Sequence, residues 1–541
     1  MLSIRSQASC AAVSLLVAFV LAGCQGTHHD SAGGSGGYSS GGAAAKPTPL
    51  VLEPPDGVWL KDAEGQEYFV DRWPKSKARR IDKKTVRTVW GIPIDVFRED
   101  EKFYYYKIYK RVATTPPLKP QQRQPSAQEV QSIRESYKAL VPASERLQFV
   151  PFGNGLPSAG QWHGFAIADM NGDGHPDIIL SPPRQAMNPV PVIFLGDGKG
   201  SWSRWREVKF PPLAYDYGDV QVGDLNGDGH LDLVFGVHLR GLIALLGDGK
   251  GVFREWGRGL DFAADGRTAF SSQAIKIIDW NGDGKPDILA LSEGPGMLGR
   301  RMVNHSRGTI MYLNHGDGTW ERRAKGEKNG LFGGSLTIGD FDGDGHPDFA
   351  TSTGVMDRRD LVNLWRPKDR WETVTVKELR PMAFVWSVAA ADFDGDGRAD
   401  LAVAYTNFEL STWRSGIDIL FSRADGHWER RTTFAGEGLN GPVALATGDL
   451  DGDGHKDLVA LTATGDTLVF LGDGRGHFTR EKTPPPAYPG GCYGAHVELA
   501  DLDGDGRDEV VAAFADAAEE SHCPSGGGLT AWKAQPRSGT P

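Results

Sequence analysis

The chain has 541 residues, a length that suggests several domains unless a repeat array merges most of them into one body. Its hydrophobic fraction of 39% and its 15 Trp residues are enough for a sizeable core, and its formal net charge is −11. No nucleophile motif, Walker-type phosphate loop, zinc cluster or dinucleotide fingerprint is present in the sequence, which argues against the corresponding enzyme classes.

Residues 1–23 are predicted to be an export signal. Arg5 supplies a positive charge, and the apolar run Ala11–Leu21 is too short for an ordinary membrane span. The segment ends in Leu-Ala-Gly-Cys, which resembles the lipobox of bacterial lipoproteins and implies lipidation of Cys24. The alternative is an ordinary cleaved signal followed by an incidental Cys. We expect a lipid-anchored protein at the bacterial cell envelope, on the outer membrane or facing the periplasm.

The remaining cysteines agree with export. Residues 24–46 are rich in Gly, Ser and Ala and are predicted to be a flexible tether. Cys10 leaves with the signal and Cys24 takes the lipid, so Cys492 and Cys523 are the two that remain. In an oxidising compartment we expect them to form a disulfide, and a metal-binding or catalytic role is the alternative.

Two segments precede the repeats. Residues 47–113 alternate aromatic and β-branched residues with polar ones, which predicts a small β-rich domain. Its basic run from Arg72 to Arg87 suits an anionic partner or a plain solvated face. Residues 114–146 begin as a Pro-rich linker and continue as a predicted helix, capped by Ser126 and spaced helically up to Leu140.

An acidic nine-residue motif then recurs. DMNGDGHPD starts at Asp169, and six further copies follow at intervals of 52 to 61 residues. Each copy lies between two short apolar strands, and a third and fourth strand follow around a Gly-Asp-Gly turn. Four antiparallel strands in about 50 residues are typical of a propeller blade. We therefore predict an all-β, seven-bladed β-propeller over residues 147–535, with a short tail at 536–541.

The last blade lacks its fourth strand in the sequence. The third strand of the seventh copy lies near 529–532, where the chain is close to its end, whereas 147–157 resembles a fourth-strand segment. We expect this N-terminal strand to complete the seventh blade and to remove the free edge.

The motif is predicted to hold Ca²⁺. Positions 1, 3, 5 and 9 offer side-chain oxygens, and Gly at positions 4 and 6 lets the loop bend around an ion. Carboxylate-rich, all-oxygen ligation suits Ca²⁺ better than Mg²⁺. An EF-hand is excluded because position 12 is an apolar strand residue. The predicted ligands, for up to seven structural ions, are Asp169, Asn171, Asp173 and Asp177; Asp224, Asn226, Asp228 and Asp232; Asp279, Asn281, Asp283 and Asp287; Asp340, Asp342, Asp344 and Asp348; Asp392, Asp394, Asp396 and Asp400; Asp449, Asp451, Asp453 and Asp457; and Asp501, Asp503, Asp505 and Glu509.

Glycine and aspartate turns without metal are the alternative, but packed carboxylates repel one another unless a cation is bound. The seventh loop is the least regular, because Glu509 brings a longer side chain to position 9. Seven bound Ca²⁺ and loss of the signal would change the formal net charge from −11 to about +2.

These tandem loops between apolar strands resemble the FG-GAP/VCBS repeats, known from the integrin α-subunit propeller and from exported bacterial proteins. The resemblance covers about residues 147–535. It implies that the calcium loops brace one face of the propeller and that a ligand meets the opposite face.

Residues at that opposite face are candidates for ligand binding. They lie in the loops between strands two and three or just before each first strand, where the copies differ most. These candidates are His163, Asp219, Gln273, Arg300, Arg301, Arg358, Arg359, Trp386, Trp413, Arg414 and His496. A basic rim with aromatics suits an anionic or saccharide ligand, and a solvated rim is the alternative.

The sequence thus favours a non-enzymatic, monomeric, calcium-stabilised module for binding or adhesion. Its expected partners are the membrane, through the N-terminal lipid, and a protein or acidic carbohydrate, with no role for nucleic acid. The alternative is a propeller-type polysaccharide lyase or hydrolase, in which His163 and His496 act with Tyr217 or Tyr493.

Overall fold

The computed structural model describes residues 60–61, 67–80, 84–88, 93–109, 137–184, 186, 189–298, 301–323, 330–368, 370–409, 412–516, 523 and 526–537. The export signal, Cys24 and the tether lie outside these residues. By its internal contacts the chain divides into two compact units, one comprising 23–121 with 297–302 and the other comprising the rest. Among the described residues, no helix is long and apolar enough to span a membrane.

The described part of the N-terminal segment is a six-stranded sheet in the order β1-β2-β6-β5-β4-β3. Its strands are β1 (Leu60–Lys61), β2 (Glu67–Pro74), β3 (Ala78–Arg80), β4 (Thr85–Thr88), β5 (Pro93–Glu99) and β6 (Phe103–Tyr109), with one 3₁₀ turn at Lys75–Lys77. The sheet agrees with the expected β-rich unit.

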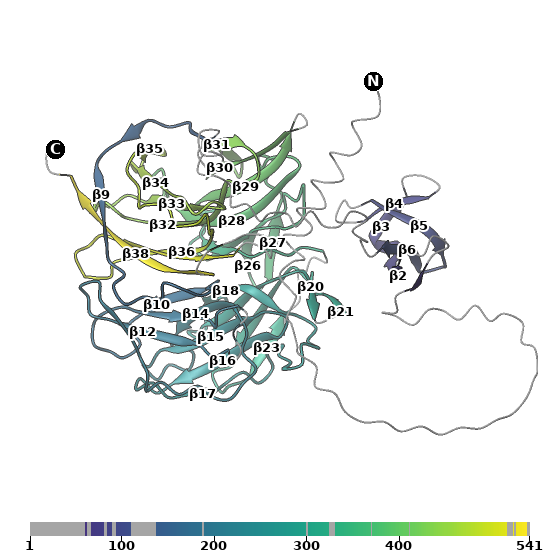
Figure 1. Cartoon of the computed structure of the whole chain (residues 1–541), viewed down its shortest axis with the longest axis horizontal. Helices are drawn as coiled ribbons and strands as arrows, with labels where there is room; N and C mark the ends of the chain where they lie inside the picture. Colours follow the sequence, from purple (N-terminus) through teal and green to yellow (C-terminus); the bar gives the residue numbers. More distant parts are fainter. Residues whose placement is uncertain are drawn as a thin grey trace, which may run out of the picture. The chain divides into compact units, whose positions relative to one another are not determined.

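Seven antiparallel sheets follow, one for each copy of the motif, which confirms the predicted seven-bladed propeller (Figure 1). The first three blades are β10 (Phe165–Ala168), β11 (Asp177–Leu180), β12 (Val192–Gly196) and β13 (Trp202–Arg204); β14 (Gly218–Gly223), β15 (Asp232–Val237), β16 (Gly241–Gly247) and β17 (Phe253–Glu255); and β18 (Ser272–Ile278), β19 (Asp287–Ser292), β22 (Thr309–Asn314) and β23 (Trp320–Arg323). A separate hairpin, β20 (Pro295–Leu298) with β21 (Arg301–Asn304), is inserted in the third blade.

The remaining blades repeat this order. They are β24 (Leu336–Gly339), β25 (Asp348–Thr351), β26 (Val362–Arg366) and β27 (Arg370–Val374); β28 (Ala383–Ala391), β29 (Asp400–Glu409), β30 (Thr412–Ser422) and β31 (Trp428–Glu437); β32 (Pro442–Gly448), β33 (Asp457–Thr462), β34 (Thr467–Gly472) and β35 (Phe478–Glu481); and β36 (Tyr493–Ala500), β37 (Glu509–Ala515) and β38 (Gly527–Pro536).

The ring closes as the sequence predicts. The fourth strand of the seventh blade is β9 (Leu147–Pro151), which pairs antiparallel with β38 from Leu147↔Pro536 to Pro151↔Trp532. Figure 1 shows the blue β9 beside the yellow β38. The first strands of successive blades contact one another, and β36 contacts β10, so these seven strands surround the axis.

The predicted helix does not continue to Leu140. Its first part lies outside the described residues, but β7 (Lys138–Ala139) is a short strand that pairs with β31 at the outer edge of blade five. Tyr137 stacks on Phe434, with ring centroids 5.7 Å apart, and Leu140 N donates to Thr433 O. A second short strand, β8 (Ala143–Ser144), pairs parallel with β35 of blade six. The unpaired backbone groups of the blade edges hold this segment extended, against its helical spacing.

The core lies between neighbouring blades. The second strands are buried along their whole length in most blades, as in β15, β19, β33 and β37, because both faces pack against adjacent sheets. Their residues are mostly Val, Ile, Leu, Ala and Phe, which suit a pleated surface buried on both sides. The disulfide predicted between Cys492 and Cys523 is confirmed, and both residues are buried in blade seven.

Candidate functional site

Each acidic loop is folded by its own first aspartate. In blade one, Asp169 Oδ1 accepts hydrogen bonds from Gly172 N at 2.8 Å and Asp173 N at 3.1 Å, while its Oδ2 accepts one from Gly174 N at 2.8 Å. The glycines at positions 4 and 6 of all seven loops have φ between 72° and 87°, in the left-handed region that glycine tolerates best. The loop conformation is therefore a property of the nine residues themselves.

The carboxylate at position 9 joins the loop to the sheet. Asp177 is fully buried, and it accepts hydrogen bonds from Met170 N at 2.9 Å and from Gly196 N of the third strand at 3.0 Å. Burial raises the pKa of Asp177 to about 6 and that of Asp457, its counterpart in blade six, to about 8. A buried carboxylate with a raised pKa is costly to ionise, so a nearby cation would stabilise its charged form.

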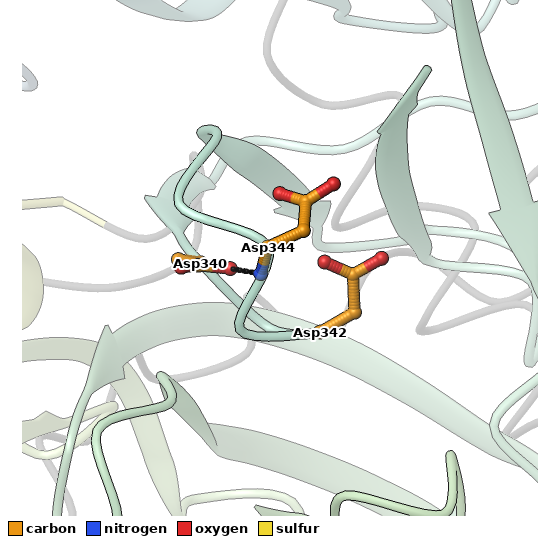
Figure 2. Close-up of side chains that lie close together, drawn as sticks. All are labelled: Asp340, Asp342 and Asp344. Carbon is orange, nitrogen blue, oxygen red and sulfur yellow. Dashed lines mark hydrogen bonds between the residues drawn. The ribbon is translucent and has the colours of Figure 1, made fainter.

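Four loops bring three carboxylate oxygens within 4.8 Å of one another, a spacing at which they could hold a metal ion. The groups are Asp340, Asp342 and Asp344; Asp392, Asp394 and Asp400; Asp449, Asp451 and Asp453; and Asp501, Asp503 and Glu509. Figure 2 shows the group of blade four, with the hydrogen bond from Asp344 N to Asp340. Asp342 Oδ1, Asp394 Oδ1 and Asp503 Oδ1 are buried and accept no hydrogen bond from the described residues. Such orphaned oxygens fit a hard, oxygen-binding cation.

In the first three blades position 3 is Asn. Asn171 and Asn226 each donate a side-chain hydrogen bond of 2.9 Å to the aspartate at position 5, namely Asp173 and Asp228. The amide oxygen keeps these loops chemically suited to a cation, with one negative charge fewer than the other four loops carry.

In the other four blades, a basic side chain contacts the aspartate at position 3. Arg366 Nη1 lies 3.0 Å from Asp342, Arg146 Nη2 lies 2.8 Å from Asp451, and Arg423 and Lys533 donate hydrogen bonds to Asp394 and Asp503. The sequence did not predict these pairs, because the basic residues lie outside the motif.

The first strands surround a cavity of about 320 Å³, whose lining extends from His163 to residues close to the acidic loops, such as Thr447 and Leu499. Its lining includes five of the predicted ligand-face residues, which are His163, Asp219, Gln273, Trp386 and His496, together with Ser387. These residues come from blades one, two, three, five and seven. His163 precedes β10, and Asp219 and Gln273 are the second residues of β14 and β18, so these three lie at the strand ends away from the acidic loops. Trp386 and Ser387 lie within β28, and His496 lies within β36.

A row of rings leads from this cavity into blade two. The His163 and Tyr217 rings lie 5.0 Å apart, the Tyr217 and His238 rings stack at 4.4 Å, and the Arg184 guanidinium lies 5.7 Å from the Tyr217 ring centre. Burial, helped by the charges of Arg184 and His238, lowers the pKa of His163 to about 3. His163 is therefore neutral near pH 7.

Sequence reasoning missed a polar cluster beside this row. Glu293 accepts hydrogen bonds from Gln273 Nε2 and Leu239 N at 2.7 Å and from Ser271 Oγ, and its carboxylate lies 2.7 Å from His238 Nδ1. Although burial opposes ionisation, the charge and hydrogen bond of His238 hold the pKa of Glu293 below its usual value. The sequence carries no pattern that predicts a buried glutamate, and only the position of Glu293 at the start of the third-blade insertion could have suggested this cluster.

Three of the predicted arginines each lie near a carboxylate. Arg358 makes a two-pronged pair with Asp360 at 2.9 Å, Arg359 lies 3.5 Å from Asp357, and Arg414 lies 3.9 Å from Glu437. Asp357 and Asp360 lie in the same loop as Arg358 and Arg359, whereas Glu437 lies on β31 opposite Arg414 on β30. The three arginines are not among the residues that line the cavity. Arg300 lies outside the described residues, and of Arg301 the structure gives only its backbone position in β21.

The predicted tryptophans belong to an aromatic group on blade five. Phe384 stacks with Trp386 at 5.9 Å and with Trp413 at 6.4 Å, and the Phe408 and Trp413 rings are 5.1 Å apart. All four rings are partly exposed. The long strands β29 and β30 extend to this group, which adjoins the cavity through Trp386.

Comparison with known proteins identifies the repeats. The family described as FG-GAP-like repeat matches residues 185–235, 279–351, 410–460 and 449–512, and the family described as FG-GAP repeat matches 384–409. Human integrin alpha-7 is 25% identical over 169 residues, which are 29% of this chain and 14% of that protein, so the match spans only a small part of the integrin chain.

Two solved structures also align with the chain. The BP39L lectin from Burkholderia pseudomallei has a TM-score of 0.43 and 13% identity, over 69% of this chain and 96% of the lectin. BBS1N, from its complex with ARL6DN, has a TM-score of 0.40 and 9% identity, over 73% of this chain and 98% of BBS1N. From its repeat matches, its integrin relative and its seven blades, the chain is an FG-GAP-repeat, integrin-alpha-like β-propeller.

Proposed function

We propose that this protein is a non-enzymatic binding or adhesion module of the cell envelope that receives a carbohydrate at the mouth of its central cavity. An FG-GAP propeller fold by itself suggests a binding or adhesion-type module. The observation that carries the location is the convergence of His163, Gln273, Trp386 and His496 from four separate blades on one cavity.

The chemistry of the mouth favours a sugar. Partly exposed aromatic rings offer flat apolar faces, and neighbouring histidine, serine and glutamine side chains offer hydrogen bonds, a combination that fits the two kinds of surface on a sugar ring. Because Arg358, Arg359 and Arg414 lie near carboxylates and none of them lines the cavity, they give no reason to require an anionic sugar. A protein ligand would need a broader contact than this cavity, including the loops around it.

The test is binding of the purified protein to an array of neutral and uronate-containing glycans. Trp386→Ala and His496→Ala are expected to weaken binding at least tenfold, because each removes a cavity-lining contact. Val252→Ala, at an exposed position outside the cavity lining, is the control and should bind as the wild type does. Equal binding by all variants, or no glycan bound at all, would contradict the proposed site.

The proposed module is anchored through a lipid on Cys24 and stabilised by Ca²⁺. The anchor is supported by the lipobox-like sequence that ends at Cys24, and the metal by the clustered carboxylates of the acidic loops. In bacteria expressing the protein, Cys24→Ala should abolish incorporation of labelled fatty acid and release the protein from the membrane fraction. Unchanged labelling would refute the anchor without affecting the proposed cavity.

A further inference from the structure

At positions 1, 3, 5 and 9 the seven acidic loops differ by one carboxylate. Loops one to three have Asn at position 3 and three carboxylates at these four positions, whereas loops four to seven have Asp there and four. In each of the four loops with the extra carboxylate, one arginine or lysine contacts the aspartate at position 3. The added cation offsets the charge of that carboxylate.

Three of these partners are arginines that lie closest to the aspartate at position 3. Arg366 contacts Asp342 and also Glu372 on the neighbouring strand β27, at 3.0 Å each. Arg423 likewise contacts Asp394 and Glu429 of β31, and it lies 3.9 Å from Asp396. Arg146 reaches Asp451 at 2.8 Å but is 4.0 Å from Asp453. Each guanidinium therefore lies closest to the carboxylate at position 3 and, among the described residues, makes no ion pair with the carboxylate at position 9.

Lys533 of β38 behaves differently. Its ammonium donates hydrogen bonds to Asp503 and, at 2.7 Å, to Asp505, and it lies 3.7 Å from Glu509 Oε1. It thus contacts the carboxylates at positions 3, 5 and 9 together, which are three of the four side chains that a cation would use. Only 14% of the Lys533 side chain is exposed.

The glutamate at position 9 makes this arrangement possible. In the other blades position 9 is Asp, which reaches the backbone of the third strand, as Asp457 does with Gly472 N at 2.8 Å. Glu509 keeps the bond to the loop, from Leu502 N at 2.7 Å, but its Oε1 accepts no hydrogen bond and has Lys533 as its nearest cation among the described residues. Glu509, the irregular residue at position 9, and Lys533 therefore belong to the same set of contacts.

We propose that the ammonium of Lys533 holds the acidic loop of blade seven in place of a divalent cation. A second cation among the same oxygens would lie within a few ångströms of the ammonium, where repulsion between a double and a single charge is strong. The ammonium carries one positive charge where Ca²⁺ carries two. Because it is covalently part of the chain, the loop needs no ion from solution. Blade seven, which carries the closing strand β9, then stays ordered whatever the calcium concentration.

This inference rests on the proposal that the other loops bind Ca²⁺, and counting ions tests both. The full-length protein, equilibrated with ⁴⁵Ca²⁺ by dialysis, is compared with Lys533→Met and with Lys285→Met. Lys285 is the matched control, because it is 42% exposed and contacts only Asp283 of its loop, at 3.3 Å. Lys533→Met is expected to bind one ion more than the wild type, and Lys285→Met the same number.

Equal counts for the wild type and Lys533→Met would overturn the inference. If the counts are equal and zero, the calcium proposal fails as well, so the two failures can be told apart. Because Lys533→Met leaves the carboxylates of Asp503, Asp505 and Glu509 without their cation, it could fail to fold, and a second measurement uses the wild type alone. Hydrogen exchange of residues 501–509 should be the same in Ca²⁺ and in EDTA, while residues 169–177 become protected by Ca²⁺. Equal protection of both loops by Ca²⁺ would also refute the role of Lys533.

Discussion

Glu481, at the end of the fourth strand of blade six, accepts a hydrogen bond at Oε2 from Leu147 N, the first residue of the closing strand, at 3.1 Å. The same oxygen accepts one from Arg146 N at 2.8 Å, and Glu481 is fully buried. A single carboxylate of blade six thus positions the strand that completes blade seven. The ring closure depends on this contact as well as on the pairing of β9 with β38.

Replacing Glu481 should therefore loosen the closure. Glu481→Ala leaves two backbone N–H groups unpaired at a buried position, and we expect the free energy of unfolding to fall by about 2–4 kcal/mol. Denaturant unfolding followed by tryptophan fluorescence measures the change. Glu372→Ala is the control, since this glutamate is 63% exposed and its ion pair should contribute less than about 1 kcal/mol. Similar losses for both variants would show that Glu481 has no special role.

The disulfide of blade seven should stabilise the same region. Cys492 and Cys523 close a loop with a sequence separation of 31 residues, for which loop-closure entropy predicts about 3–4 kcal/mol. The double variant Cys492→Ser, Cys523→Ser should unfold at correspondingly lower denaturant concentration. Adding dithiothreitol should bring the wild type to the same midpoint and leave the double variant unchanged. A midpoint that does not depend on the disulfide would contradict this estimate.

Removal of calcium should lower the melting temperature, because an ion that binds only the folded state stabilises it by about 2.7 kcal/mol per site at a hundred times its dissociation constant. EDTA should reduce the melting temperature by several degrees, and Ca²⁺ should restore it more fully than Mg²⁺. Asp394→Ala, which removes the side-chain oxygen at position 3, should reduce this response, whereas Asp425→Ala should not, since Asp425 is a 71% exposed turn residue of the same blade. Identical melting curves in EDTA and Ca²⁺ would refute structural calcium.

His163 should make the protein less stable in mild acid. Its pKa is lowered to about 3 by burial and by the charges of Arg184 and His238, whereas an unfolded His titrates near 6.5. Below pH 6.5 the unfolded chain therefore binds a proton that the folded protein excludes, and stability falls as the pH falls; above pH 6.5 the effect vanishes.

The test compares His163→Phe with the wild type at pH 7 and pH 5. Between these values the wild type should lose about 1–2 kcal/mol more than the variant, which has no proton to exclude at this position. Parallel pH profiles for the two proteins would show that His163 is protonated as easily in the folded state as in the unfolded state.

Much of the fold was predictable because its signals are local. Seven copies of the motif and the alternation of short apolar strands indicated seven blades, and the truncated last copy indicated that 147–157 closes the ring. Within the segment predicted as helix, Lys138 and Ala139 instead form a short strand, because blade five offers an unpaired edge. A local sequence pattern carries no information about a pairing partner so far away in the chain.

In the candidate sites, too, some features follow from the local sequence and others only from the packing of the blades. The nine residues of each loop determine its bend, since the first aspartate binds backbone N–H groups three to five residues ahead and the glycines permit positive φ. The packing of the seven blades into a ring determines the remaining contacts. It brought Lys533 to Asp505, Glu293 to His238, and five predicted face residues to one cavity. These contacts join residues far apart in the chain, and their geometry exists only once the blades have packed around a common axis.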